Sequence, residues 1–205
     1  MHLPSYLSTL QALRYVERRL PVTIPPAKQR SARQGRYHLV DPFLRFYFRF
    51  IHPHRDVVAY APERLLPALQ SGLRAFVDQT AWEDLARHWV RERGAAGALP
   101  CEPEVVGSHW SRRVQVDVVA INWKTKAALV GECIWGPDAV DRAVVRELIG
   151  RKIPLTLADL PEKGAHWPVT PVIFARAGVT VAARETLAAH GGMAVDLAQV
   201  YADLG

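Results

Sequence analysis

The spacing of apolar residues predicts that the chain begins with helices. Between residues 6 and 16, apolar side chains recur every three or four positions, which is typical of an amphipathic helix. An Asp-Pro pair at residues 41 and 42 predicts the start of a second helix, because Asp caps a helix and Pro suits its first position. This helix is predicted to end at Pro53. Residues 65–93 are also predicted to be helical, with one break.

Short runs with a different period predict strands in both halves of the chain. Residues 22–24 and 37–40 are β-branched and aromatic runs joined by a loop rich in Pro, Ser and Arg. After residue 100 apolar and polar residues alternate, which is the pattern of a half-buried strand. Strand, strand, helix, strand, helix and a final strand or short helix are predicted over residues 114–120, 127–135, 138–151, 171–175, 180–190 and 193–201. This order predicts an α/β fold with a mixed sheet and helices on its faces.

Composition places the chain among ordinary globular proteins. Of its 205 residues, 49% are hydrophobic and 22% are charged. There is no run of eighteen apolar residues, so we expect no membrane partner. The N-terminal segment lacks the continuous apolar stretch of a secretory signal. Cys101 and Cys133 provide no framework of disulfides and are expected to be reduced thiols in a cytoplasmic protein.

Positive charge is concentrated near the N-terminus. The net charge is +6, and no acidic residue occurs between Glu17 and Asp41. Such a basic stretch is typical of contact with nucleic-acid phosphates, although it also occurs in solvated loops. The candidate DNA-binding residues are Lys28, Arg30, Arg33 and Arg36.

Two carboxylates are predicted to meet on the central hairpin. A hairpin centred between Lys124 and Thr125 places Asp117 opposite Glu132. Opposed carboxylates on an apolar sheet repel each other unless a hard divalent cation lies between them. The pair therefore predicts a metal site, with Mg²⁺ or Mn²⁺ as candidates. The alternative is that both side chains face solvent at the edge of the sheet.

The two strands of this hairpin also carry a family resemblance. The segments RVQVDVVAIN and ALVGECIW resemble the core motif of PD-(D/E)xK nuclease-fold proteins, in which an Asp is followed by Glu-x-Lys on the next strand. More narrowly, the chain resembles the C-terminal region of archaeal-type (DEXX-box) P-loop ATPases. In that region a winged helix precedes a Tyr-x-x-x-Asp-Pro-Phe-Leu-Arg-Phe segment, which is matched here from Tyr37 to Phe46. Further matches are Gly107, Trp110 and the pair Trp82-Glu83.

The resemblance extends over nearly the whole chain and implies two domains. Residues 1–56 would form a partial winged helix with a linking helix, in agreement with the order helix, strand, basic loop, strand. Residues 57–205 would form a restriction-endonuclease-like mixed sheet flanked by helices. The resemblance also implies an acidic catalytic cluster of Glu83, Asp117 and Glu132. Glu83 has a second explanation, since with Thr80 it has the spacing of a capping box.

Two residues depart from the family pattern. Gln115 stands where an acidic residue is common, and Ile134 stands where the Lys belongs. A lysine there would orient the attacking water and stabilise developing charge, which an isoleucine cannot do. Lys152, in the next predicted helix, is a candidate for a migrated catalytic lysine. The alternative is that Lys152 is an exposed residue at a helix end, where the helix dipole favours a cation.

These residues favour a nucleic-acid-associated module with a catalytically degenerate nuclease fold. The first alternative is an active metal-dependent DNA nuclease that uses Lys152, and the second is a protein-interaction domain for a P-loop ATPase. The chain contains no G-x-x-x-x-G-K-[ST] motif, so no nucleotide cofactor is expected.

Overall fold

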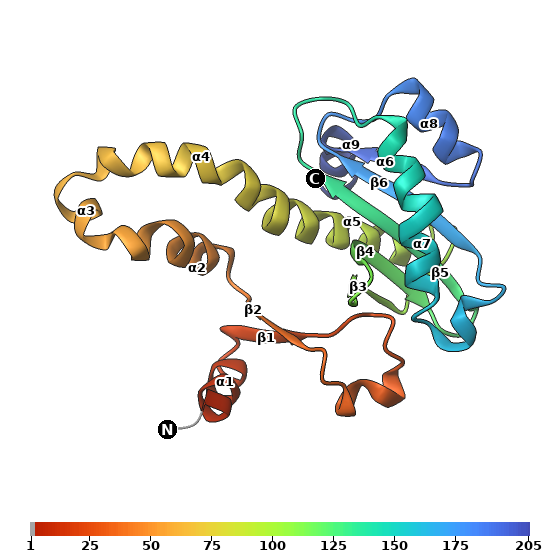
Figure 1. Ribbon diagram of the computed structural model, residues 1–205, viewed down its shortest axis with the longest axis horizontal. Helices are drawn as coiled ribbons and strands as arrows, with labels where there is room; N and C mark the ends of the chain where they lie inside the picture. The colour runs from red at the N-terminus through yellow and green to blue at the C-terminus, as the bar shows by residue number, and fades with distance from the viewer. Residues whose placement is uncertain (1–2) are drawn as a thin grey trace. The chain divides into compact units, whose positions relative to one another are not determined.

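The computed structural model describes residues 3–205 (Figure 1) and divides them into two compact units. The first unit contains residues 3–20 and 33–81, and the second contains residues 21–32 and 82–205. This division differs from the boundary after residue 56 that the sequence suggested. Among the described residues, no helix has the length and apolar character needed to cross a membrane.

The first unit opens with a helix and a two-stranded hairpin. Helix α1 (Leu3–Ala12) is followed by β1 (Val16–Arg19), which pairs antiparallel with β2 (Arg36–Leu39). The first strand was predicted at residues 22–24, and this prediction is wrong. Three prolines surround that segment and cannot donate to a sheet ladder, so the chain pairs earlier, at Val16.

A run of short helices completes the first unit. Asp41 caps α2 (Pro42–Phe46) as predicted, because its carboxylate accepts from the amide of Phe43 at 2.7 Å. The predicted end at Pro53 is wrong, since the chain makes only a single 3-10 turn there and then resumes as helix. The elements that follow α2 are η2 (Tyr47–Ile51), η3 (His52–His54), α3 (Arg55–Tyr60), η4 (Pro62–Leu65), α4 (Leu66–Phe76) and η5 (Val77–Trp82). The ring of Phe76 packs on those of Phe46 and Phe50, at centroid distances of 6.0 and 5.4 Å. These contacts explain why the helices after residue 56 belong to the first unit.

The second unit contains a five-stranded mixed sheet, which confirms the predicted α/β class. Its strands in spatial order are β3 (Val105–Trp110), β4 (Gln115–Asn122), β5 (Ala127–Ile134), β6 (Val169–Ala175) and β7 (Met193–Asp196). The first three run antiparallel to one another, whereas β5, β6 and β7 are parallel. The predicted hairpin register is confirmed, since Asn122 pairs with Ala127 and Val118 with Gly131. Strand β3 was missed by the sequence interpretation.

Helices cover both faces of this sheet (Figure 1). One face packs against α6 (Arg142–Glu147), η6 (Leu148–Lys152), α7 (Ile153–Leu157) and α8 (Val181–Ala188). The other face packs against α5 (Glu83–Ala95) and α9 (Leu197–Leu204). The last predicted element is therefore a strand followed by a helix. Two 3-10 turns, η1 (Pro26–Ser31) and η7 (Pro161–Gly164), complete the unit.

The first residues of the basic loop, which joins β1 to β2, are hydrogen-bonded to β3. The amide of Val22 donates to the carbonyl of Ser108 at 3.1 Å. The buried hydroxyl of Thr23 is hydrogen-bonded to Nδ1 of His109 at 2.8 Å, and Nε2 of His109 lies 3.2 Å from a carboxylate oxygen of Asp159. Burial lowers the pKa of His109, against the raising effect of Asp159. The segment from residue 21 to residue 32 thus packs as part of the sheet unit.

Candidate active site

Asp117 lies at an irregularity in β4. Between the pairs Gly107–Val119 and His109–Val116, two residues of β4 lie opposite a single residue of β3. Asp117 is one of these two, so it occupies a β-bulge, a feature that re-aims side chains and is common beside active sites. The ladder of β4 with β5 ends at the pair Val118–Gly131, so Asp117 lies one residue outside it.

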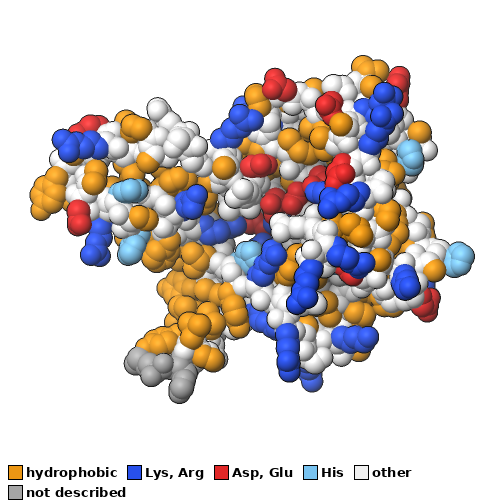
Figure 2. All heavy atoms as spheres, in the orientation of Figure 1, with side chains coloured by type: hydrophobic (Ala, Val, Ile, Leu, Met, Phe, Trp, Pro, Cys, Tyr) orange, Lys and Arg blue, Asp and Glu red, His pale blue; other side chains and the backbone are white. Residues whose placement is uncertain are grey.

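The carboxylate of Asp117 reaches across to β5. Its Oδ2 atom accepts the amide hydrogen of Cys133, with 3.1 Å between the heavy atoms. Cys133 follows Glu132, so Asp117 is held beside the glutamate that the sequence predicted to be its neighbour. The two strand ends are therefore joined by a side chain instead of a backbone pair. Figure 2 shows acidic side chains gathered on the visible face of this unit, with Lys and Arg side chains around them.

Glu132 is half-buried, and among the described residues only one of its carboxylate oxygens has a partner. One carboxylate oxygen, Oε2, forms an ion pair with the Nζ atom of Lys152. Within the part of the chain that the structure describes, the other oxygen, Oε1, is buried without a hydrogen-bond partner. Burial and the nearby charge of Asp117 raise the pKa of Glu132 to about 7, against the lowering effect of Lys152. Glu132 therefore has one oxygen available for a further ligand.

Glu83 joins the same electrostatic cluster from α5. Burial and the charge of Asp117 raise its pKa to about 7, although the adjacent Arg87 lowers it. The predicted capping box is absent, because the hydroxyl of Thr80 donates backward to the carbonyl of Phe76 within the π-helical turn η5. Glu83 is the first residue after that turn. Wide turns of this kind are rare and occur often at functional sites.

Arg87 holds the α5 side of the cluster together. Its guanidinium is buried and donates to Glu83 at 3.1 Å, to Asp84 at 2.9 Å and to the backbone carbonyl of Asp117 at 2.7 Å. The sequence interpretation did not assign a role to Arg87 or Asp84. The signal was present, since carboxylates three and four residues before an arginine lie on one helix face.

Lys152 is not at a helix end. The helix continues through the π-helical turn η6 into α7, and the Lys152 side chain is only 22% exposed. The ion pair brings its ammonium group to Glu132, whereas Ile134, two residues further along β5, packs in the apolar core. The ammonium group that contacts Glu132 therefore comes from the helical run of η6 and α7 and not from β5. The alternative, an exposed lysine at a helix end that is favoured by the helix dipole, does not describe Lys152.

The donor set suits a hard divalent cation. Asp117 and Glu132 provide anionic oxygens, and the unpartnered Oε1 of Glu132 is the kind of buried atom that a cation would satisfy. Among residues 3–205, no group of three or more His, Cys, Asp or Glu side chains is close enough to bind a metal alone. A cation here would rely on two carboxylates together with water or phosphate oxygens, as Mg²⁺ commonly does.

The predicted DNA-binding residues do not form one cluster within a single unit. Lys28 and Arg30 lie on the 3-10 turn η1 in the second unit, and both are exposed. Arg33 and Arg36 are also exposed but belong to the first unit. Lys28 and Arg30 belong to the segment 21–32, whose first residues are hydrogen-bonded to β3.

Comparison with known proteins gives a family of unassigned role. A protein-family model, DUF234, described as archaea bacterial proteins of unknown function, matches residues 47–145. An uncharacterized protein of Methanocaldococcus jannaschii is 28% identical over 151 aligned residues, and the alignment covers 69% of this chain and 31% of that protein. The chain thus spans about a third of the length of this curated relative. No solved structure matches the chain.

Proposed function

We propose that the second unit is a metal-dependent nuclease whose catalytic lysine is Lys152. The observation that carries this proposal is the ion pair between Lys152 and Glu132. In the PD-(D/E)xK pattern the lysine lies two residues after the glutamate, where this chain has Ile134. A lysine that reaches the same glutamate from η6 offers the same positive charge, so the loss at residue 134 does not require the loss of catalysis.

Each residue of the cluster has a definable role in phosphodiester hydrolysis. Asp117 and Glu132 would hold Mg²⁺ or Mn²⁺, which supplies Lewis-acid activation of the phosphate and of a bound water. Lys152 would donate a hydrogen bond to the attacking water or to the phosphate oxygen on which charge develops. Glu83, which accepts a hydrogen bond from Arg87, would add a third carboxylate to the cluster from α5. The bulge at Asp117, the π turn before Glu83 and the π turn that contains Lys152 would orient these side chains toward one another.

Nucleic acid is the substrate that the charge distribution supports. The chain carries a net charge of +6, although its candidate catalytic cluster is acidic. Positive charge around an acidic metal site attracts a polyanion and leaves the cation to engage the phosphate. Exposed Lys28 and Arg30 on the sheet unit are candidate phosphate contacts, as are Arg33 and Arg36. The resemblance to the C-terminal region of archaeal-type ATPases agrees with this assignment.

The proposal is tested by incubating the chain with supercoiled plasmid DNA and Mg²⁺ or Mn²⁺. We expect the wild type to nick the plasmid and Asp117→Ala to reduce the rate at least about 100-fold, because the cation loses a ligand. Asp138→Ala is the matched control, since Asp138 is exposed on the loop after β5 and has no partner in the described structure. Nicking that Asp117→Ala and Asp138→Ala retain equally would reject the proposed site.

A protein-interaction role is the second candidate, and it rests on the first unit. Thirteen of the fifteen exposed large apolar side chains among the described residues lie in this unit. Such a concentration favours a protein partner, and a P-loop ATPase is the candidate that the family resemblance suggests. This function would be preferred if the chain neither cleaves DNA nor retards labelled DNA at low salt, yet binds such an ATPase independently of salt.

A further inference from the structure

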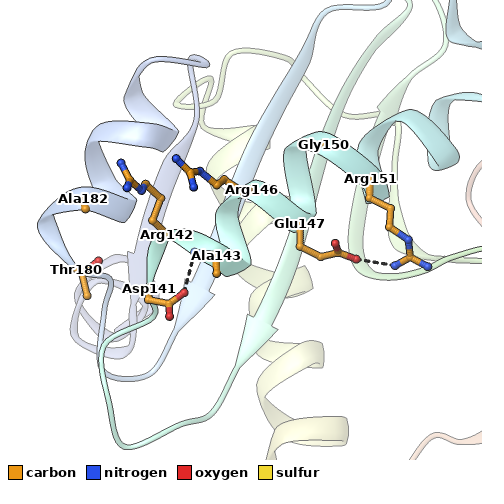
Figure 3. A pocket seen from close by; sticks show the side chains of 9 residues that line it. All are labelled: Asp141, Arg142, Ala143, Arg146, Glu147, Gly150, Arg151, Thr180 and Ala182. Atoms are coloured by element: carbon orange, nitrogen blue, oxygen red, sulfur yellow. Dashed lines mark hydrogen bonds and ion pairs between the residues drawn. The ribbon is translucent and has the colours of Figure 1, made fainter.

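Two arginines on the surface of α6 have no protein partner. Arg142 and Arg146 are four residues apart, so they share one face of the helix, and both are exposed. Among the described residues, neither guanidinium takes part in an ion pair or a hydrogen bond. Figure 3 shows both side chains projecting to the same side of α6. Two unpaired cations held side by side are available to an anionic ligand.

The two arginines border a surface depression of about 660 Å³ between α6, η6 and the start of α8 (Figure 3). Small residues make up much of its lining, namely Ala143, Gly150, Thr180 and Ala182. Their size leaves room for an extended ligand to approach the helix backbone closely.

The acidic residues of the depression are already engaged. The carboxylate of Asp141 caps α6 by accepting from the amide of Ala143 at 2.8 Å. Glu147 accepts from Arg151, with 2.6 Å between the heavy atoms. Neither carboxylate neutralises Arg142 or Arg146, so the positive charge of this pair is directed to solvent.

We infer that Arg142 and Arg146 bind the phosphodiester backbone of the nucleic acid at a distance from the bond that is cleaved. This inference rests on the proposed function, because it places a second contact for the same substrate. The guanidinium group binds phosphate through two parallel hydrogen bonds, and the open depression accommodates a strand.

The position of the pair along the helix favours a nucleic acid over an acidic protein. Arg142 and Lys152 belong to one helical run, and ten residues at 1.5 Å each separate them by roughly 15 Å. One strand of duplex DNA advances about 3.4 Å per phosphate, so this span corresponds to about four phosphates. Along the helix axis, the arginine pair therefore lies within a few phosphates of the candidate catalytic lysine, Lys152.

The inference is tested by binding without cleavage. The fluorescence anisotropy of a labelled 20-base-pair duplex is measured with the whole chain in EDTA at several salt concentrations. We expect Arg142→Gln combined with Arg146→Gln to weaken binding about tenfold and to lower the slope of log K against log salt by about two, because two phosphate contacts are lost. The matched control is Lys124→Gln combined with Lys163→Gln, which removes two exposed charges near the turn at the start of β5. This control should leave the slope nearly unchanged.

The outcomes separate this inference from the nuclease proposal. An unchanged slope in the arginine variant, or an equal loss in the lysine control, overturns the inference even if the wild type cleaves DNA. A selective loss in the arginine variant supports the inference even if the wild type cleaves nothing. Tighter binding of a labelled ten-glutamate peptide than of the duplex, lost in the arginine variant, would also overturn it and assign the depression to an acidic protein.

Discussion

Replacing Lys152 by Met is expected to reduce the rate of DNA cleavage at least about 100-fold while the chain stays folded. The substitution keeps most of the apolar stem of the side chain but removes the only ion pair that the structure gives Glu132 within residues 3–205. Loss of a preorganised donor in a partly buried site typically costs two to three orders of magnitude in rate. Plasmid nicking under single-turnover conditions measures the loss, and thermal unfolding checks the fold.

A rescue experiment distinguishes a catalytic role from a structural one. Ile134→Lys restores the family pattern on β5, so adding it to Lys152→Met should recover part of the cleavage rate. Arg151→Met is the matched control, because Arg151 is the exposed neighbour of Lys152 and pairs with Glu147 on the helix surface. Full activity in Lys152→Met, or an equal loss in Arg151→Met, would contradict the role assigned to Lys152.

The metal-free protein is expected to lose stability as the pH rises from 5 to 8, through Glu83 and Glu132. Both have a pKa of about 7 in the folded chain, against an ordinary value of 4.5. The folded state therefore binds more protons between these values, and its stabilisation, complete below pH 4.5, disappears as the pH passes 7. Each of the two glutamates contributes on the order of 3 kcal/mol to this change in the free energy of unfolding.

Asp117→Asn should recover part of this loss. The amide can still accept the Cys133 amide hydrogen, but it lacks the charge that disfavours both glutamate anions. We expect a gain of about 1 kcal/mol in the free energy of unfolding at pH 8 and little change at pH 5. Denaturant unfolding in EDTA at the two pH values measures it, with Asp138→Asn as control. A variant less stable than the wild type at pH 8 would argue against repulsion at Asp117.

The pairing of β4 with β5 could be predicted because its signals are local. A polar turn at residues 123–126, with an alternating pattern before it and an apolar run after it, predicts the register, and the structure has that register. The bulge at Asp117 could not be predicted, because it depends on β3, whose residues carry only a weak strand pattern. The contact of Asp117 with the Cys133 amide is a consequence of that bulge and of the early end of the ladder.

The contact of Lys152 with Glu132 also could not be predicted from the sequence, because it depends on an irregular element. Helical spacing indicated a helix that ends near residue 151, but the chain widens into the π-helical turn η6 and continues. A π turn changes which side chains share a face, and it has no sequence signature as clear as a helix cap. The same difficulty arose at η5, where Thr80 has the spacing of a capping box but lies inside the helical run.

Direct titration of Mn²⁺ into the metal-free chain is the most decisive measurement of all, because it requires neither substrate nor cleavage. Calorimetry of the wild type should show one Mn²⁺ bound per chain, with affinity reduced at least about tenfold in Asp117→Ala and unchanged in Asp138→Ala. Equal affinity in all three proteins, or no binding by the wild type at millimolar Mn²⁺, would contradict a cation site between Asp117 and Glu132.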